Sequence, residues 1–162
     1  MTMLEIVESG RKLSVDDLAR VEQSIGRPLP EQYGAFLLAH NGGRPRPNLI
    51  DIHGADFKGT DISVFHGIDD STESCDLLWN LEVLEGCKDN KLLPIACDSG
   101  GNIFMLDLSK EHHGEVLYFD SAEVPPRPYF LAKDFNGFLA QIRDWTPEEL
   151  ADIQASLEAT AD

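Results

Sequence analysis

Residues 92–120, LLPIACDSGGNIFMLDLSKEHHGEVLYFD, carry the strongest β-sheet pattern of the chain. Three runs in this stretch are apolar and rich in β-branched or aromatic residues, as strands are. They are Leu92 to Cys97, Asn102 to Leu108 and Glu115 to Phe119. Turn-forming residues separate them at 98–101 and 112–114. The stretch therefore predicts three strands in an antiparallel meander.

Two helices are predicted in the N-terminal part of the chain. Ser14 is a suitable N-cap, and the apolar residues after it recur at helical spacing until Gly26. Pro30 can begin a second helix, because proline is tolerated in a first helical turn. Asparagine and glycine at 40–43 favour the left-handed conformation that ends a helix. The next segment, Arg44 to Pro47, predicts a stiff loop.

Weaker patterns lie between the second helix and the meander. Two short strands are predicted at 49–52 and 62–65, with a polar segment at 54–61 between them. A helix is predicted at 76–84.

The C-terminal part predicts two more helices. Prolines at 125–128 interrupt the chain, and Asp134 can then cap a helix that contains Phe135 and Phe138. Thr146 and Pro147 are a strong start for a last helix to about Glu158. Its apolar face is narrow, so this helix either packs lightly on the domain or contacts a partner.

These elements predict an α+β fold, a single domain with a mixed, mostly antiparallel sheet and flanking helices at both ends. A chain of 162 residues suits one domain with an ordinary hydrophobic core. We expect residues 1–13 to be an N-terminal lead, 14–143 to be the domain and 144–162 to be a C-terminal helical extension.

Charge limits the partners of this chain. The formal net charge is -16, so the surface should repel nucleic-acid backbones and attract basic proteins. We therefore expect no direct binding to nucleic acid. The same charge also keeps a protein soluble without any specific partner. The sequence sets no oligomeric state.

The cysteines and the N-terminus indicate the compartment. The three cysteines, Cys75, Cys87 and Cys97, form no C-x-x-C pair and are odd in number, which argues against disulfides and zinc. No stretch has the apolar core of a signal peptide or the length of a membrane span. We expect a cytoplasmic protein that does not insert into membranes.

Catalytic motifs are missing from the sequence. It contains no phosphate-binding loop, dinucleotide fingerprint, nucleophile elbow or zinc-protease helix. The adjacent His112 and His113 point apart on an extended chain, and the loop after Asp98 lacks the glutamate that closes a calcium site. We predict no catalytic residue, no cofactor and no metal. A hydrolase that uses aspartates and histidines near the meander is the remaining enzymatic alternative.

One acidic cluster is a candidate contact surface. It comprises Asp69, Asp70, Glu73 and Asp76, between the predicted strands and the central helix. Such a cluster either binds a basic partner or stays in water. We expect partner binding through these four residues, on charge and predicted exposure alone.

Several short motifs, in order along the chain, resemble the SUKH superfamily. They are Leu29-Pro30 with Tyr33 and Phe36, Asn41-Gly42-Gly43, Leu93-Pro94-Ile95-Ala96 with Asp98-Ser99-Gly100-Gly101-Asn102, and Leu131-Ala132 with Phe135 and Phe138. The resemblance covers about 14–143. Its eukaryotic members include yeast cell-wall synthesis regulators, and many bacterial members are immunity proteins that bind and block toxins, often nucleases.

The resemblance implies a non-catalytic binding protein, with these residues serving the fold. Our first expectation is an immunity protein that neutralises a basic bacterial polymorphic or contact-dependent toxin. A regulatory scaffold like the yeast relatives is the alternative, although the long disordered arms expected of one are missing from this sequence. An acidic nucleic-acid mimic would use the same surface.

Overall fold

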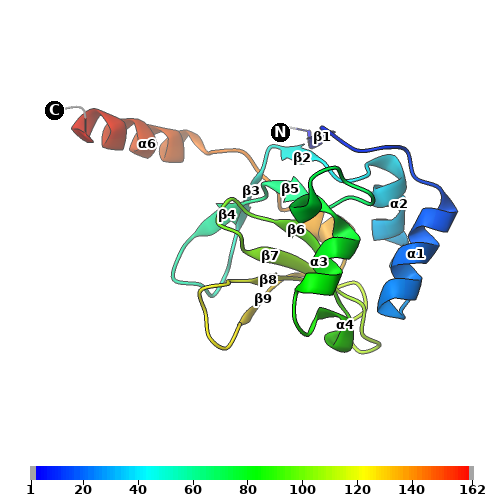
Figure 1. Cartoon of the computed structure of the whole chain (residues 1–162). Helices are drawn as coiled ribbons and strands as arrows, with labels where there is room; N and C mark the ends of the chain where they lie inside the picture. The colour runs from blue at the N-terminus through cyan, green and yellow to red at the C-terminus, as the bar shows by residue number, and fades with distance from the viewer. Residues whose placement is uncertain (1–2, 161–162) are drawn as a thin grey trace.

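The computed structural model describes residues 3–160 and contains three antiparallel sheets with six α-helices (Figure 1). The largest sheet has five strands in the order β5 (Val64–Phe65), β6 (Leu92–Cys97), β7 (Ile103–Asp107), β8 (Val116–Phe119) and β9 (Pro128–Ala132). The predicted meander is its centre, β6 to β8. The α+β prediction is confirmed, and the only parallel pairing between described residues is an isolated bridge from Gly67 to Asp76.

Two small sheets extend this core. One pairs β1 (Glu5–Val7) with β2 (Arg44–Arg46), and the other pairs β3 (Leu49–Asp51) with β4 (Gly59–Asp61). The prediction of a loop at 44–47 was therefore wrong for Arg44–Arg46. A proline is tolerated there because the two-stranded sheet consists of edge strands.

Two further strands differ from the sequence interpretation. The segment 54–61 was expected to be only polar connection, but it contains β4. The proline-rich segment was expected to be a break, but Pro128 begins β9, which pairs with β8. Proline is acceptable as the first residue of a strand, and local propensity gave no signal for either pairing.

Five of the six helices begin and end close to the predicted residues, and the short helix at 87–90 was not predicted. The helices are α1 (Val15–Ile25), α2 (Glu31–Ala39), α3 (Leu77–Val83), α4 (Cys87–Asn90), α5 (Phe135–Leu139) and α6 (Pro147–Thr160), with a 3-10 turn at Glu73–Cys75. Asp134 and Asp76 cap α5 and α3 by accepting hydrogen bonds from Gly137 N and Trp79 N. Gly26 ends α1 with φ 74°. Within residues 3–160, no helix is long and apolar enough to cross a membrane.

Aromatic side chains from both ends of the chain form the centre of the core. Phe36 of α2 lies 4.9 Å from Phe135 of α5 and 5.0 Å from Phe65 of β5, between ring centroids. Phe138 of α5 lies 5.8 Å from Phe104 of β7. The helices predicted at both ends therefore meet over the sheet. In Figure 1, α3 crosses in front of the sheet and α6 projects away from the domain.

Candidate partner-binding surface

The structure places the four predicted acids in one loop, between β5 and α3. Asp69 is exposed but already has two partners, because its carboxylate lies 2.8 Å from Arg11 Nη2 and 3.1 Å from Arg20 Nη1. These hydrogen bonds, first from Arg20 and then from Arg11, lower the pKa of Asp69 to about 2. Arg11 and Arg20 also bind Asp17, so much of the charge of Asp69 is compensated locally.

Asp76 also serves the fold. Its carboxylate accepts hydrogen bonds from Trp79 N at 2.9 Å and Asp70 N at 3.1 Å, and the residue is half-buried. Asp70 accepts a hydrogen bond from Thr72 N at 2.8 Å. Glu73 is exposed. Asp70 and Glu73 are therefore the two acids of this loop whose charge is not compensated by an arginine or used in a helix cap.

Asn41 fixes the start of the loop. This buried side chain accepts a hydrogen bond from Ile68 N at 2.7 Å and donates to Ile68 O at 2.9 Å and Arg11 O at 3.1 Å. A Cβ at Gly67 would lie 2.9 Å from Asn41 Oδ1, so glycine is needed for this approach. The motif at 41–43 thus positions the acidic loop. It does not close α2, because the C-cap His40 is extended at φ -141° and the left-handed ending predicted from the sequence was wrong for this helix.

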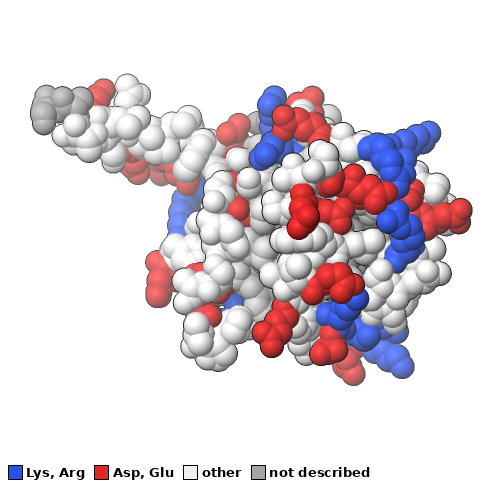
Figure 2. Space-filling model, in the orientation of Figure 1, with Lys and Arg blue, Asp and Glu red and all other residues white. Residues whose placement is uncertain are grey.

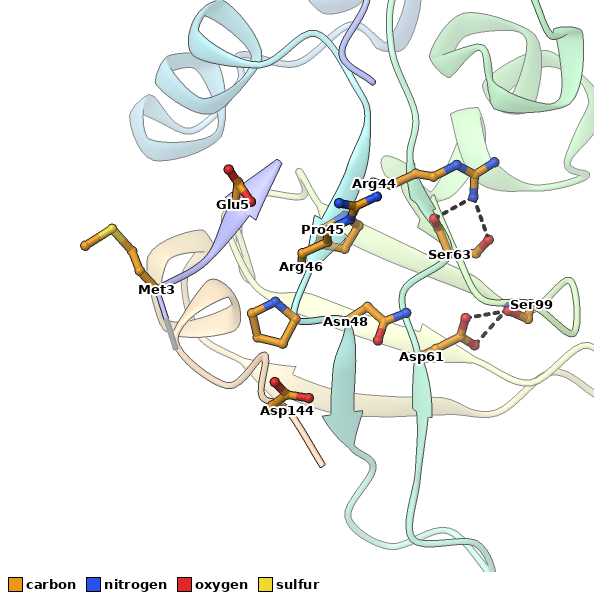
Figure 3. Close-up of a pocket in the computed structure, with 11 residues that line it drawn as sticks. Met3, Glu5, Arg44, Pro45, Arg46, Asn48, Asp61, Ser63, Ser99 and Asp144 are labelled. Atoms are coloured by element: carbon orange, nitrogen blue, oxygen red, sulfur yellow. Dashed lines mark hydrogen bonds between the residues drawn. The ribbon is translucent and has the colours of Figure 1, made fainter. Parts of the chain in front are cut away.

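A polar cleft of about 560 Å³, which the sequence did not reveal, opens beside β2 (Figure 3). Its charged lining residues come from four parts of the chain and are Glu5, Arg44, Arg46, Asp61 and Asp144. The only sequence signal for it was the Arg44 to Pro47 run, interpreted as a stiff loop. Its walls are formed by β1, by β2 and the two residues after it, by the end of β4 with Ser63, by Ser99 and by Asp144.

Hydrogen bonds fix some of these charged groups and leave others open. Arg44 Nε lies 2.8 Å from Glu8, and Arg44 Nη1 donates to Ser63 O at 3.1 Å. Asp61 accepts hydrogen bonds from the backbone and hydroxyl of Ser99 (Figure 3). Asp144 accepts a hydrogen bond from Trp145 N at 2.9 Å. Within residues 3–160 no ion pair involves Glu5, Asp61 or Asp144, although Arg44 and Arg46 line the same cleft. The cleft thus has three carboxylates and two guanidinium groups, which leaves it with an excess of negative charge.

A second hollow of about 370 Å³ adjoins the cleft, and both are lined by Arg44, Ser63 and Ser99. Ser74 and Cys75 also line it, so the cleft and the acidic loop belong to one surface. His66 in this hollow is 1% exposed and its Nδ1 lies 2.8 Å from Pro94 O. Burial lowers the pKa of His66, which keeps the imidazole neutral at pH 7.

The chemistry of this surface favours binding over reaction. Burial raises the pKa of the Cys75 thiol and raises the pKa of Cys97 to about 11, so both stay protonated and are weak nucleophiles. Among the residues that the structure describes, no three histidine, cysteine or acidic side chains converge as metal ligands. His112 and His113 are exposed and contact Glu115 and Pro28 separately.

Asp98 is one of the aspartates near the meander, and its carboxylate holds the turn after β6 through hydrogen bonds. Its Oδ1 accepts from Gly100 N at 2.9 Å and Asn102 N at 2.8 Å, and its Oδ2 accepts from Tyr118 at 2.7 Å and Thr60 at 2.8 Å. Burial alone would raise the pKa of Asp98, but these bonds outweigh it and the pKa is lowered. The turn predicted from the sequence is confirmed, with Gly101 at φ 85°.

Charges of both signs share the face shown in Figure 2, with acids more widely spread than bases. An antiparallel sheet flanked by helices, motif residues in caps and turns, and a polar cleft beside an acidic loop define a small α+β protein with a surface suited to binding.

The chain belongs to the SMI1 / KNR4 family (SUKH-1), whose family model matches residues 12–141. The resemblance to the SUKH superfamily is therefore confirmed. The match begins after β1 and ends before α6. A comparison with curated proteins gives no match.

Proposed function

We propose that this chain is a cytoplasmic immunity protein that binds and neutralises a basic bacterial toxin without catalysing any reaction. Membership of the SMI1 / KNR4 family is consistent with such a role, since many bacterial relatives of this type are immunity proteins. We propose a nuclease as the toxin, because nucleases present basic surfaces where they hold nucleic acid. An acidic inhibitor gains association rate and complementarity against such a surface.

The observation that carries the proposal is the set of uncompensated carboxylates on one continuous surface. Asp70 and Glu73 in the loop and Glu5, Asp61 and Asp144 in the cleft make no ion pair to the other described residues. Lysine or arginine side chains of a toxin would find acceptors there. Asp69 and Asp76 support this surface by holding the loop in shape.

The proposal predicts that a gene beside this one encodes a basic toxin domain. The test is growth protection together with calorimetry against that neighbouring gene product. The double variant Asp70→Lys with Glu73→Lys replaces two negative charges of the proposed surface by two positive ones. Its matched control, Asp56→Lys with Glu111→Lys, makes the same change in net charge at exposed positions elsewhere. We expect the first variant to lose about tenfold or more in affinity, since close charge pairs across an interface contribute about 1.5 kcal/mol or more.

The control should protect as well as the wild type. Equal affinity of both double variants and the wild type would exclude the loop as a contact. A neighbouring gene product that the wild type does not bind would contradict the immunity function itself.

A further inference from the structure

The last helix presents an apolar face that the rest of residues 3–160 does not bury. α6 projects from the domain (Figure 1), and none of its 14 residues is buried. Four large apolar residues of this region are exposed, with relative solvent accessibilities of 45% for Trp145, which precedes the helix, and 52%, 38% and 66% for Leu150, Ile153 and Leu157 within it. Leu150, Ile153 and Leu157 follow the i, i+3, i+7 spacing that places them on one face.

The base of α6 is anchored firmly, so the helix leaves the domain in a defined direction. Arg143 binds Glu149 at 2.7 Å and Asp51 of β3 at 2.9 Å. Lys58 lies 2.9 Å from the same Glu149. Thr146 caps the helix, since Glu149 N donates to its hydroxyl at 3.1 Å. An isolated helix of this length is marginal in water, and these contacts explain only its first turn.

A groove at the base continues the apolar face. It has a volume of about 360 Å³ and is lined in part by Leu49, Ile50 and Trp145. Trp145 is shared between the groove and the exposed face of the helix. The groove and the helix therefore form one docking surface, made of Trp145, Leu150, Ile153, Leu157 and the groove residues.

The negative charge of α6 limits the kind of partner that can cover the docking surface. The segment 144–160 contains the acids Asp144, Glu148, Glu149, Asp152 and Glu158 and neither lysine nor arginine. Figure 2 shows the projecting helix in red and white. A second copy of α6 would therefore bring like charges together. A second apolar groove, between α1 and α2, has Glu22 and Glu31 in its lining and would repel α6 as well.

We propose that α6 and the groove at its base dock into an apolar groove bordered by lysine and arginine on the toxin. This inference rests on the proposed function, because the occupant is the same basic protein. It adds a second contact region, made of apolar residues, to the acidic surface. Helix-in-groove recognition with apolar anchors at i, i+3 and i+7 is a common mode of binding.

The experiment compares two triple variants in calorimetry with the purified toxin domain encoded beside this gene. Leu150→Gln, Ile153→Gln and Leu157→Gln remove the apolar face without changing charge or helix propensity greatly. The control, Ala151→Gln, Ala155→Gln and Ala159→Gln, alters other faces of the same helix. We expect at least a 100-fold weaker affinity for the first variant and less than a threefold change for the control.

Three other outcomes would overturn the role of α6, the proposed function, or both. Equal affinity of the Leu/Ile variant and the wild type would overturn the role of α6 and leave the proposed function intact. No binding by the wild type would overturn both. Light scattering that shows a wild-type dimer, lost only in the Leu/Ile variant, would overturn the inference in favour of a second copy as occupant.

Circular dichroism of both variants establishes that α6 still forms. If the alanine control lost as much helix and as much affinity as the Leu/Ile variant, loss of the helix rather than loss of the apolar face would explain the weaker binding.

Discussion

The carboxylate of Asp98 connects three strands through hydrogen bonds. It accepts from Thr60 of β4, from the turn before β7 and from Tyr118 of β8. Asp98-Ser99-Gly100-Gly101 suggested a turn from the sequence, and local backbone bonding was predictable. The bonds to Thr60 and Tyr118 span 38 and 20 residues, which no local pattern indicates.

Replacing Asp98 by asparagine should therefore destabilise the domain. The amide puts donors where Tyr118 and Asn102 also donate, so we expect a loss of about 2–3 kcal/mol in the free energy of unfolding at pH 7. Urea denaturation measures it. The control Asp56→Asn, at an exposed site, should change stability by less than about 0.5 kcal/mol. Similar stability of both variants would contradict the role of Asp98.

The stability difference between the wild type and Asp98→Asn should depend on pH. The pKa of Asp98 is lower in the folded protein than its ordinary value. The folded state therefore favours the ionised form, and this stabilisation is complete above the unfolded pKa of about 4 and is lost as pH falls through the folded pKa. The difference between wild type and Asp98→Asn should shrink below about pH 4. A difference that stayed constant from pH 7 to pH 3 would contradict this account.

Asn41 makes a second residue-scale prediction. Its buried amide bonds both backbone groups of Ile68, so Asn41→Ala leaves Ile68 N without its acceptor. We expect a loss of about 2–3 kcal/mol in the free energy of unfolding. Amide exchange in 67–76 should rise most, because the loop loses its anchor. The exposed Asn48→Ala is the matched control, and equal exchange in the two variants would show that Asn41 does not hold the loop.

At the scale of elements, the sequence predicted best where one local signal was strong. Capping residues placed α1, α5 and α6, and apolar runs rich in β-branched or aromatic residues placed β6 to β8. β2 was missed because Arg-Pro-Arg has little strand propensity, and it becomes a strand only through pairing with β1. The cleft was missed because its walls come from five separated segments of the chain, which no local pattern brings together.

Pro94 shows how an inner strand accommodates an unfavourable residue. β6 lies between β5 and β7, and its register shifts between Pro94 and Ala96. Proline in an inner strand is expected at such a bulge. The carbonyl oxygen of Pro94 accepts a hydrogen bond from the imidazole ring of His66. The family-like run at 93–96 is therefore both a strand and the support of a buried histidine.

The anchor of α6 makes an element-scale prediction. Arg143→Gln removes the guanidinium that joins Asp51 of β3 to Glu149. Amide exchange in the first half of α6 should rise about fivefold or more, while the core strands keep their protection. Lys133→Gln, an exposed substitution outside this contact, should leave α6 unchanged. Unaltered exchange in Arg143→Gln would mean that the ion pairs do not hold the helix.

At the scale of the whole molecule, the net charge is -16, and arginines pair with some of the acidic side chains but not with others. Arg11 and Arg20 neutralise Asp69 and Asp17, and Arg143 neutralises Asp51 and Glu149. The acids of the loop and cleft keep their charge. Charge alone predicted an acidic contact surface, but it did not indicate which of the four predicted acids are used by the fold.

Binding to the toxin should therefore weaken with salt. Screening shortens the range of these charges from about 10 Å at 0.1 M to about 3 Å at 1 M ionic strength. We expect a slower association rate with a smaller change in dissociation rate, since rim charges act mainly on encounter. Surface plasmon resonance at 0.05 and 0.5 M salt measures both rates. An association rate independent of salt would contradict electrostatic steering.

The most direct measurement starts from the proposal that the neighbouring gene encodes a toxin, and titrates the catalytic activity of that gene product with the purified chain. If the chain is an immunity protein, activity should fall linearly and reach zero at one chain per toxin. Asp70→Lys with Glu73→Lys should shift the curve to higher concentrations. Full toxin activity in the presence of excess chain would contradict the central claim.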